Sequence, residues 1–163
     1  MGKMSVFSIA EYEIARWPWE RLREACGSAE QIPLALIEML NSQTPEAADS
    51  AYWKLENHVV VQGQLFEAAE FVVSALMASL LEERPLHVRV SVLELLFQIV
   101  SGEPHEDEIR LGNIDLAKKC QAKALEGLWL LYHELLFGLR EAAQEILEVI
   151  EKEPARLRSF LDL

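Results

Sequence analysis

Residues 45–63 read PEAADSAYWKLENHVVVQG, and residues 85–102 read PLHVRVSVLELLFQIVSG. The two segments begin 40 residues apart, each with a proline, and their apolar positions coincide when they are aligned. The segments before them, residues 32–40 and residues 72–80, agree at the same offset. The aligned pairs are Pro45 and Pro85, Ala48 and Val88, Tyr52 and Val92, Leu55 and Leu95, Val59 and Ile99, Ile32 and Val72, Ala35 and Ala75, Leu36 and Leu76, and Leu40 and Leu80.

Within each segment the apolar residues recur every three or four positions, as on one face of a helix. A pair of helices that recurs after about 40 residues is typical of HEAT-type helical repeats. We therefore expect an all-α fold, a HEAT-like α-α superhelix (a right-handed solenoid) of seven or eight helices without a sheet. The chain is expected to form a single domain over residues 1–163. Its predicted core includes Leu36, Tyr52, Leu55, Leu76, Leu80, Val92, Leu95 and Leu96.

Local signals predict where the helices of the repeat begin and end. Thr44 is a suitable N-cap, with Pro45 at the first helical position. Ser28 and Gln31 have the spacing of a capping box, which predicts a helix start there. The helical spacing continues through residues 59–61, so we expect a helix to continue to Gly63 rather than a strand.

Outside the repeat, three further elements are expected. Trp17-Pro18-Trp19 should open a helix that runs through Cys26. One continuous helix is predicted from Asp115 to Phe137, in which Gly127 permits the close approach of a neighbouring helix. Residues 102–113, GEPHEDEIRLGN, read as the one long connection, and long connections in helical folds are often functional.

The composition is that of an ordered globular protein. The chain has 163 residues, 51% of them apolar, with only 7 glycines and 6 prolines. A chain of this length buries about 70% of its unfolded surface, so it needs neither a metal nor a disulfide to fold. The two cysteines, Cys26 and Cys120, lack metal-site spacing, and we interpret them as two buried thiols in a reducing compartment.

The charge pattern narrows the classes of partner. The formal net charge is −12, spread over both halves of the chain. A protein with this negative charge is unfavourable for binding nucleic acid, whereas a basic protein partner is favoured. The N-terminus lacks the apolar region of a signal peptide, and no apolar run is long enough to span a bilayer. We expect a cytoplasmic protein.

The search for catalytic or cofactor chemistry gives weak candidates. His58, His87, His105 and His133 all lack the spacing of a helical metal site, and His105 beside the acids of residues 102–113 is the best of them. Phosphate-binding glycine motifs and the GxSxG elbow are absent. Glu67 and Glu70 could form an acid–base pair on one helix face, but we favour the interpretation that they are two solvated acids on the one wet face of a buried helix. We expect no catalytic activity, cofactor or metal.

Three segments resemble a group of small bacterial HEAT-like proteins: AYWKLENHVVVQGQLFEAAEFVV (residues 51–73), VRVSVLELLFQIVSGEPHEDE (residues 88–108) and ALEGLWLLYHELLFG (residues 124–138). Helical-repeat proteins of this sort are common among the immunity proteins of polymorphic and contact-delivered toxin systems. The resemblance implies an immunity protein that binds and neutralises a secreted toxin domain in the cytoplasm. The alternative is a cytoplasmic adaptor or scaffold of a larger assembly, because HEAT-like repeats serve there as well.

A solenoid binds its partner along the concave face and at interrupting loops. We expect a basic toxin domain as partner and a monomer in the free state. The candidate contacts are acids and amides that can meet a basic surface, together with two tryptophans that can anchor it. They are Glu67, Glu70, Ser74, Asn57, Gln62, Glu103, His105, Glu106, Asp107, Glu108, Trp53 and Trp129.

Overall fold

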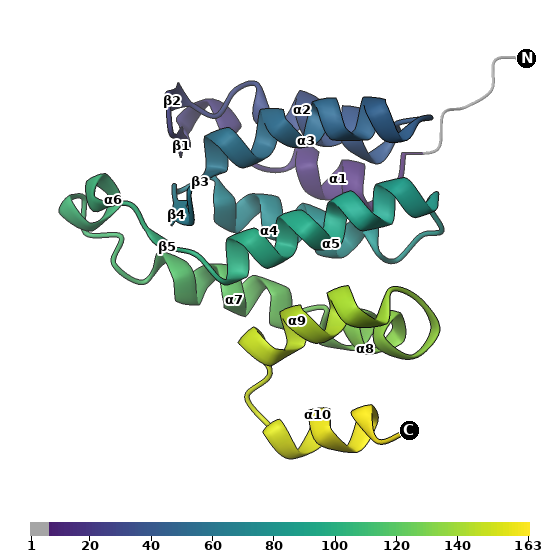
Figure 1. Cartoon of the computed structure of the whole chain (residues 1–163). Coiled ribbons are helices and arrows are strands. Elements are labelled where there is room, and N and C mark those ends of the chain that lie inside the picture. Colours follow the sequence, from purple (N-terminus) through teal and green to yellow (C-terminus); the bar gives the residue numbers. More distant parts are fainter. Residues whose placement is uncertain (1–6) are drawn as a thin grey trace, which may run out of the picture.

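A computed structural model describes residues 7–163, and this part of the chain is predominantly helical (Figure 1). Its α-helices are α1 (Ile9–Ala15), α2 (Ile32–Leu40), α3 (Pro45–Val59), α4 (Ala69–Ser79), α5 (Leu86–Val100), α6 (Glu106–Arg110), α7 (Leu116–Leu125), α8 (Leu128–Phe137), α9 (Arg140–Ile150) and α10 (Pro154–Leu161). A 3-10 turn, η1 (Trp19–Arg21), and five two-residue strands complete the described elements. The strands are β1 (Arg23–Glu24), β2 (Gly27–Ser28), β3 (Val60–Val61), β4 (Gln64–Leu65) and β5 (Glu103–Pro104).

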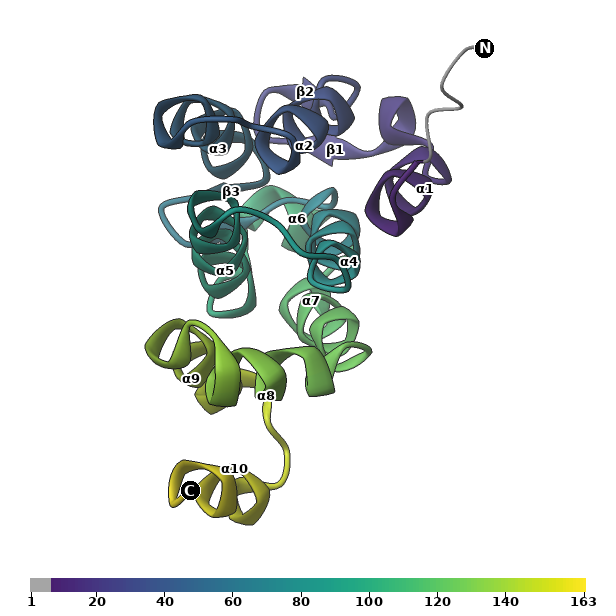
Figure 2. The ribbon, with the colours of Figure 1, turned by 90° about the vertical axis from the view of Figure 1, so that its right-hand side faces the viewer.

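The helices stack as pairs in two layers. Figure 2 shows α3, α5 and α9 above one another on one side, with α1, α4 and α7 on the other. Helix α2 lies between α3 and α1 at one end of the stack, and α8 packs beside α9 towards the other end. The all-α prediction is therefore confirmed at the level of the helical class.

The core runs between the two layers. Seven of the eight predicted core residues are buried, and Leu80 is partly buried against the same core. Helix α4 has eight buried residues out of 11. It packs against α1, α5 and α7, which explains why its sequence is apolar almost all around.

The predicted start of α3 is confirmed. The Thr44 side chain accepts a hydrogen bond from the Ala47 amide (3.1 Å), and Pro45 occupies the first turn. The apolar stripe of α3 faces the core, which leaves Asp49, Trp53 and Glu56 on its outer side. This orientation follows from the helical period and places these three side chains on the side of α3 that faces away from the core.

The prediction of a fold without strands is wrong at two short hairpins. Residues 60–65 form β3 and β4 around a two-residue turn in which Gln62 (φ 50°) and Gly63 (φ 79°) both have positive φ. This is the turn geometry that matches the twist of a hairpin, so Gly63 lies in the turn and does not end a helix. Strand β5 then pairs in parallel with β4.

The second hairpin replaces the helix predicted from Trp17 to Cys26. Strands β1 and β2 pair around Ala25 and Cys26, and Gly27 takes a φ of 135°, which L side chains rarely adopt. The Ala25 amide donates to the His58 carbonyl (2.8 Å), which fixes the hairpin to the end of α3. Ser28 therefore lies in β2 and not at a helix cap, and α2 begins only at Ile32.

Two further boundaries differ from the prediction and raise the helix count above seven or eight. The continuous helix over residues 115–137 is divided at Gly127 into α7 and α8. A Cβ at Gly127 would lie 2.5 Å from Met77 Cε, so the predicted close approach of a neighbouring helix, α4, is present. The connection at residues 102–113 contains β5 and α6. Within residues 7–163, none of the helices is both long and apolar enough to cross a membrane.

Candidate functional site

The predicted contact residues Glu67 and Glu108 belong to one internal ion-pair group, here called the Arg23 cluster. Glu108 is only 1% exposed, and its carboxylate accepts from Arg23 Nε (3.0 Å) and Arg23 Nη2 (2.7 Å). The Glu108 carboxylate also accepts from the Glu67 amide and from Asn113. Glu67 accepts from the Arg23 amide (3.0 Å) and pairs with its guanidinium (3.1 Å).

The Arg23 cluster is electrostatically satisfied. Burial acts to raise the pKa of Glu108, but the hydrogen bonds from Arg23, Asn113 and the Glu67 amide hold that pKa below its usual value. The cluster joins β1, the turn before α4 and α6, which are distant in sequence. The Glu108 carboxylate therefore stabilises the fold and is not available to a binding partner in this structure.

The other predicted acids of residues 103–107 lie at the surface. Glu103 is exposed in β5, and Glu106 and Asp107 are exposed on α6, where both pair with Arg110 (3.0 and 2.5 Å). His105 is half-buried, accepts from the Asp107 amide as the N-cap of α6, and stacks on Phe66 at 4.8 Å. These residues lie together, as their spacing implied.

The side chains of α4 that were predicted to contact a partner are mostly inaccessible. Ser74 is buried and donates to Glu13 of α1. Glu70 is half-buried, and its charge adds to the effect of burial in raising the pKa of the buried Cys120 thiol. Glu70 keeps a partly accessible carboxylate, which forms no hydrogen bond or ion pair with a side chain of residues 7–163.

The two predicted anchor tryptophans are both exposed but lie on different helices. Trp53 is 49% exposed on α3, where its ring meets Tyr52 edge-on. Trp129 is 61% exposed on α8, next to Phe160 of α10 and under the guanidinium of Arg156. Asn57 is exposed near the end of α3, and Gln62 is exposed in the β3–β4 turn.

A second acidic group was not singled out by sequence. Asp49, Trp53 and Glu56 follow one another at helical spacing along the outer side of α3, and Glu94 extends from the neighbouring helix α5. We call Asp49, Trp53, Glu56 and Glu94 the α3–α5 acidic face. Trp53 thus stands between carboxylates rather than alone.

The acids of the α3–α5 acidic face lack a neutralising base within residues 7–163. The one lysine of α3, Lys54, pairs with Glu38 of α2 (3.0 Å), and the one arginine of α5, Arg89, pairs with Glu134 of α8 (2.6 Å). Partial burial raises the pKa of Glu94, and repulsion from Glu56 and Asp49 raises it further. These carboxylates therefore repel one another in the free protein.

The Tyr52 hydroxyl lies beneath this face. It is buried, and among the described residues it makes no hydrogen bond of ordinary geometry. Burial raises the pKa of Tyr52, and the interaction of its hydroxyl with the Glu56 carboxylate and the negative charges of Glu94 and Asp49 raise it further.

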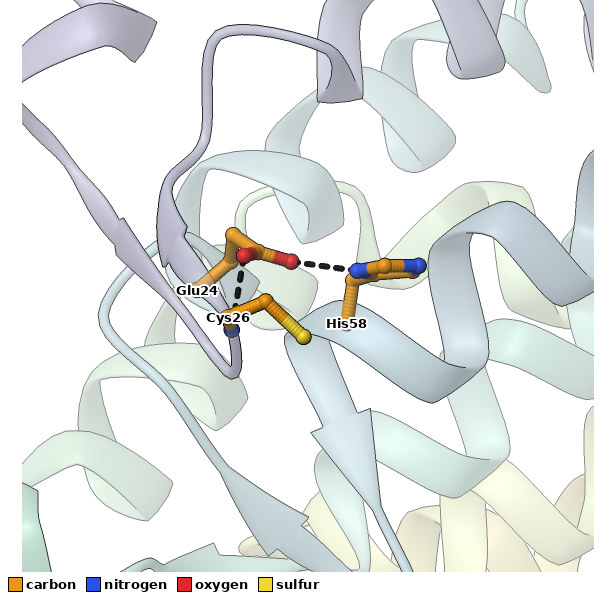
Figure 3. A group of neighbouring side chains, drawn as sticks. All are labelled: Glu24, Cys26 and His58. Carbon is orange, nitrogen blue, oxygen red and sulfur yellow. Dashed lines mark hydrogen bonds and ion pairs between the residues drawn. The ribbon is translucent and has the colours of Figure 1, made fainter.

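One group of potential metal ligands is present in the described chain. Carboxylate, thiol and imidazole atoms of Glu24, Cys26 and His58 lie within 4.8 Å of one another (Figure 3). This group was not predicted from the sequence, because the hairpin that carries Glu24 and Cys26 was predicted to be helical and His58 lies 34 residues from Glu24. His105, the metal candidate suggested by sequence, is not part of any such group in residues 7–163.

Comparisons with protein-family models, curated proteins and solved structures found no match to this chain. The resemblance to HEAT-like immunity proteins therefore remains a prediction.

Proposed function

We propose that the stacked helix pairs form a HEAT-like superhelix that binds a protein and catalyses no reaction. Its most specific role is that of an immunity protein, which binds a cognate secreted toxin domain and blocks it. The observation that carries the proposal is the α3–α5 acidic face, where three carboxylates lie near an exposed tryptophan and none of them pairs with a base within residues 7–163.

Electrostatics favours a basic partner at this face. Asp49, Glu56 and Glu94 repel one another in the free protein, and an arginine or lysine from a partner would relieve that repulsion. The net charge of −12 would also draw a basic domain towards the molecule from a distance.

Trp53 supports a tight complex at the same place. Charge pairs at an interface mainly speed association and select the partner, whereas buried aromatic side chains supply much of the affinity. Trp53 is half exposed and held edge-on by Tyr52, so a partner can cover its ring with little loss of side-chain freedom. The exposed acids Glu103, Glu106 and Asp107 are a second candidate surface for the same basic partner.

The test begins with the gene next to this one. If it encodes a secreted protein with a toxin-type C-terminal domain, that domain is expressed with and without this protein. We expect growth to be restored, and a purified complex with a dissociation constant of about 1 nM or tighter, about −12 kcal/mol.

Charge reversal then locates the surface. Asp49→Lys combined with Glu56→Lys should weaken the complex at least tenfold, about 1.4 kcal/mol, while thermal unfolding stays cooperative. Glu30→Lys combined with Glu83→Lys changes the net charge equally at exposed positions elsewhere and serves as the control. Equal loss in both variants would show that only net charge matters.

The adaptor alternative gives a different outcome. An adaptor would leave toxin-treated cells unprotected and would bind a resident protein of the cell through the same face. Absence of both growth protection and any direct complex with the neighbouring domain would contradict the immunity role.

A further inference from the structure

Glu24, Cys26 and His58 come from two elements that are fixed to each other. Glu24 ends β1, Cys26 lies in the β1–β2 turn, and His58 lies in the last turn of α3. The Ala25 amide binds the His58 carbonyl at 2.8 Å, and the Ala68 amide binds the Arg23 carbonyl at 3.0 Å. The hairpin therefore holds its two side chains at a defined place beside α3.

Glu24 organises the group. Its side chain is only 7% exposed; Oε2 lies 2.5 Å from His58 Nδ1, and Oε1 accepts from the Cys26 amide at 2.7 Å. The prediction of two buried thiols is wrong for Cys26, which is exposed in the hairpin turn, and the His58 side chain is 38% exposed. A carboxylate oxygen, a sulfur and a ring nitrogen thus converge on one accessible point.

The arrangement does not match a nucleophilic triad. In a triad the acid binds one ring nitrogen of the histidine and the nucleophile faces the other. Here Glu24 occupies Nδ1, Figure 3 shows Cys26 Sγ on that same side of the ring, and Nε2 points away from both. The three donor atoms face a shared point, as ligands of one ion do.

We propose that Glu24, Cys26 and His58 bind a divalent transition-metal ion, with zinc as the preferred ion. Thiolate, imidazole and carboxylate are the three zinc ligands used by proteins, and three of them with one open position make a four-coordinate site. Bonds of about 2.0–2.3 Å to a tetrahedral ion place ligand atoms about 3.3–3.8 Å apart, so small side-chain movements suffice. The metal replaces the proton shared by Glu24 and His58, and the thiol proton is released.

A cavity of about 360 Å³ adjoins the group: Glu24 and His58 line it together with Gln31, Glu38 and Lys54, so water can reach these two ligands. Cys120 offers a contrast, because it is buried and burial raises the pKa of its thiol, so it serves as an internal control.

The test uses the full-length protein after chelation. Cobalt(II) is titrated as a spectroscopic probe, followed by zinc. We expect one equivalent of cobalt to produce a sulfur-to-cobalt charge-transfer band and tetrahedral ligand-field bands, which zinc then removes. The expected dissociation constant for zinc is about 1 µM or tighter. A thermal shift of about 5–10 °C is expected at a hundredfold excess over that constant.

Variants distinguish the site from adventitious binding. Cys26→Ser should abolish the charge-transfer band, and His58→Gln and Glu24→Gln should each weaken cobalt binding at least tenfold. Cys120→Ala and His133→Gln remove one thiol and one exposed imidazole elsewhere and should bind like the parent. Zinc should also protect Cys26 from alkylation.

Three results would overturn the proposal. They are the absence of a charge-transfer band in the parent, persistence of that band in Cys26→Ser, and equal alkylation of Cys26 with and without zinc. Circular dichroism and thermal melts of each metal-free variant show whether it is folded, so misfolding cannot be mistaken for a lost site.

Discussion

The Arg23 cluster and the α3–α5 acidic face are both rich in carboxylates, but only the first contains a base. In the Arg23 cluster, Glu67 and Glu108 share one guanidinium, and the pKa of Glu108 lies below its usual value despite its burial. On the α3–α5 acidic face, burial and repulsion from Glu56 and Asp49 raise the pKa of Glu94. The same residue type is thus stabilising in one place and destabilising in the other.

This difference separates structural acids from acids available to a partner. A buried carboxylate that accepts several hydrogen bonds holds distant segments together and has no capacity left for a ligand. Carboxylates that only repel one another contribute nothing to the folded state and gain from an added cation. In a protein with a net charge of −12, whether a carboxylate is paired with a base therefore says more about its function than its negative charge does.

The largest expected effect is on the Arg23 cluster. Arg23→Ala leaves the Glu108 carboxylate buried without its cation, which should lower the free energy of unfolding by about 3 kcal/mol. This is the low end for a buried pair, because the Arg23 side chain is 41% exposed. Urea unfolding at pH 7 measures the change.

The control is Arg110→Ala, which removes an arginine from the exposed pairs with Glu106 and Asp107. Exposed ion pairs contribute about 0–1 kcal/mol, so this variant should unfold nearly like the parent. Equal losses in the two variants would mean that the Arg23 cluster has no special structural role.

Lowering the pH should selectively remove the stabilisation that comes from carboxylates paired with an arginine. Hydrogen bonds from Arg156 lower the pKa of Glu151 to about 2, from 4.5, and the pKa of Glu108 is also lowered. Because these folded-state pKa values lie below the unfolded values, their stabilisation is fully present above about pH 4.5. It is lost as the pH falls through the folded-state values towards about 2.

Urea unfolding at pH 7, 4.5 and 3 measures this loss. Arg156→Ala removes the main cause of the Glu151 shift, so its stability should fall less steeply between pH 4.5 and 3 than that of the parent. An unchanged slope in Arg156→Ala would contradict the assignment.

The smallest effect concerns the α3–α5 acidic face and has the opposite sign. Glu94→Gln removes one of three repelling charges and should stabilise the free protein at pH 7 by about 0.5 kcal/mol. The folded-state pKa of Glu94 is raised, so its destabilisation disappears as the pH falls through that value, and the benefit of the variant should vanish with it. Glu83→Gln, an exposed acid in the turn before α5, should change stability by nearly zero at pH 7.

Sequence predicted helices α3 and α5 well, for a physical reason. α3 and α5 have continuous apolar stripes and proline at or before their first turn, and these signals are local. The hairpins were missed because two-residue strands have no period to detect. The turn at Gln62 and Gly63 interrupts a segment whose valines fit a helix equally well.

The sites were less predictable, because their members are far apart in the chain. Arg23 and Glu108 are 85 residues apart, and nothing local distinguishes Glu108 from Glu106. The proximity of Glu94 to the acids of α3, which it repels, depends on how α5 packs beside α3. Trp53, predicted as an anchor, is exposed and lies outside the buried stripe of α3, and that stripe is local information.

Carboxyl chemical shifts titrated by NMR test the distinction between the two regions most directly. In the free protein, the Glu94 side chain should titrate above the usual range for glutamate and Glu108 below it. Binding of a basic partner should lower the pKa of Glu94 and leave that of Glu108 unchanged. A Glu94 carboxyl that titrates at or below its usual value in the free protein would contradict the account, because the α3–α5 acidic face would then already be neutralised.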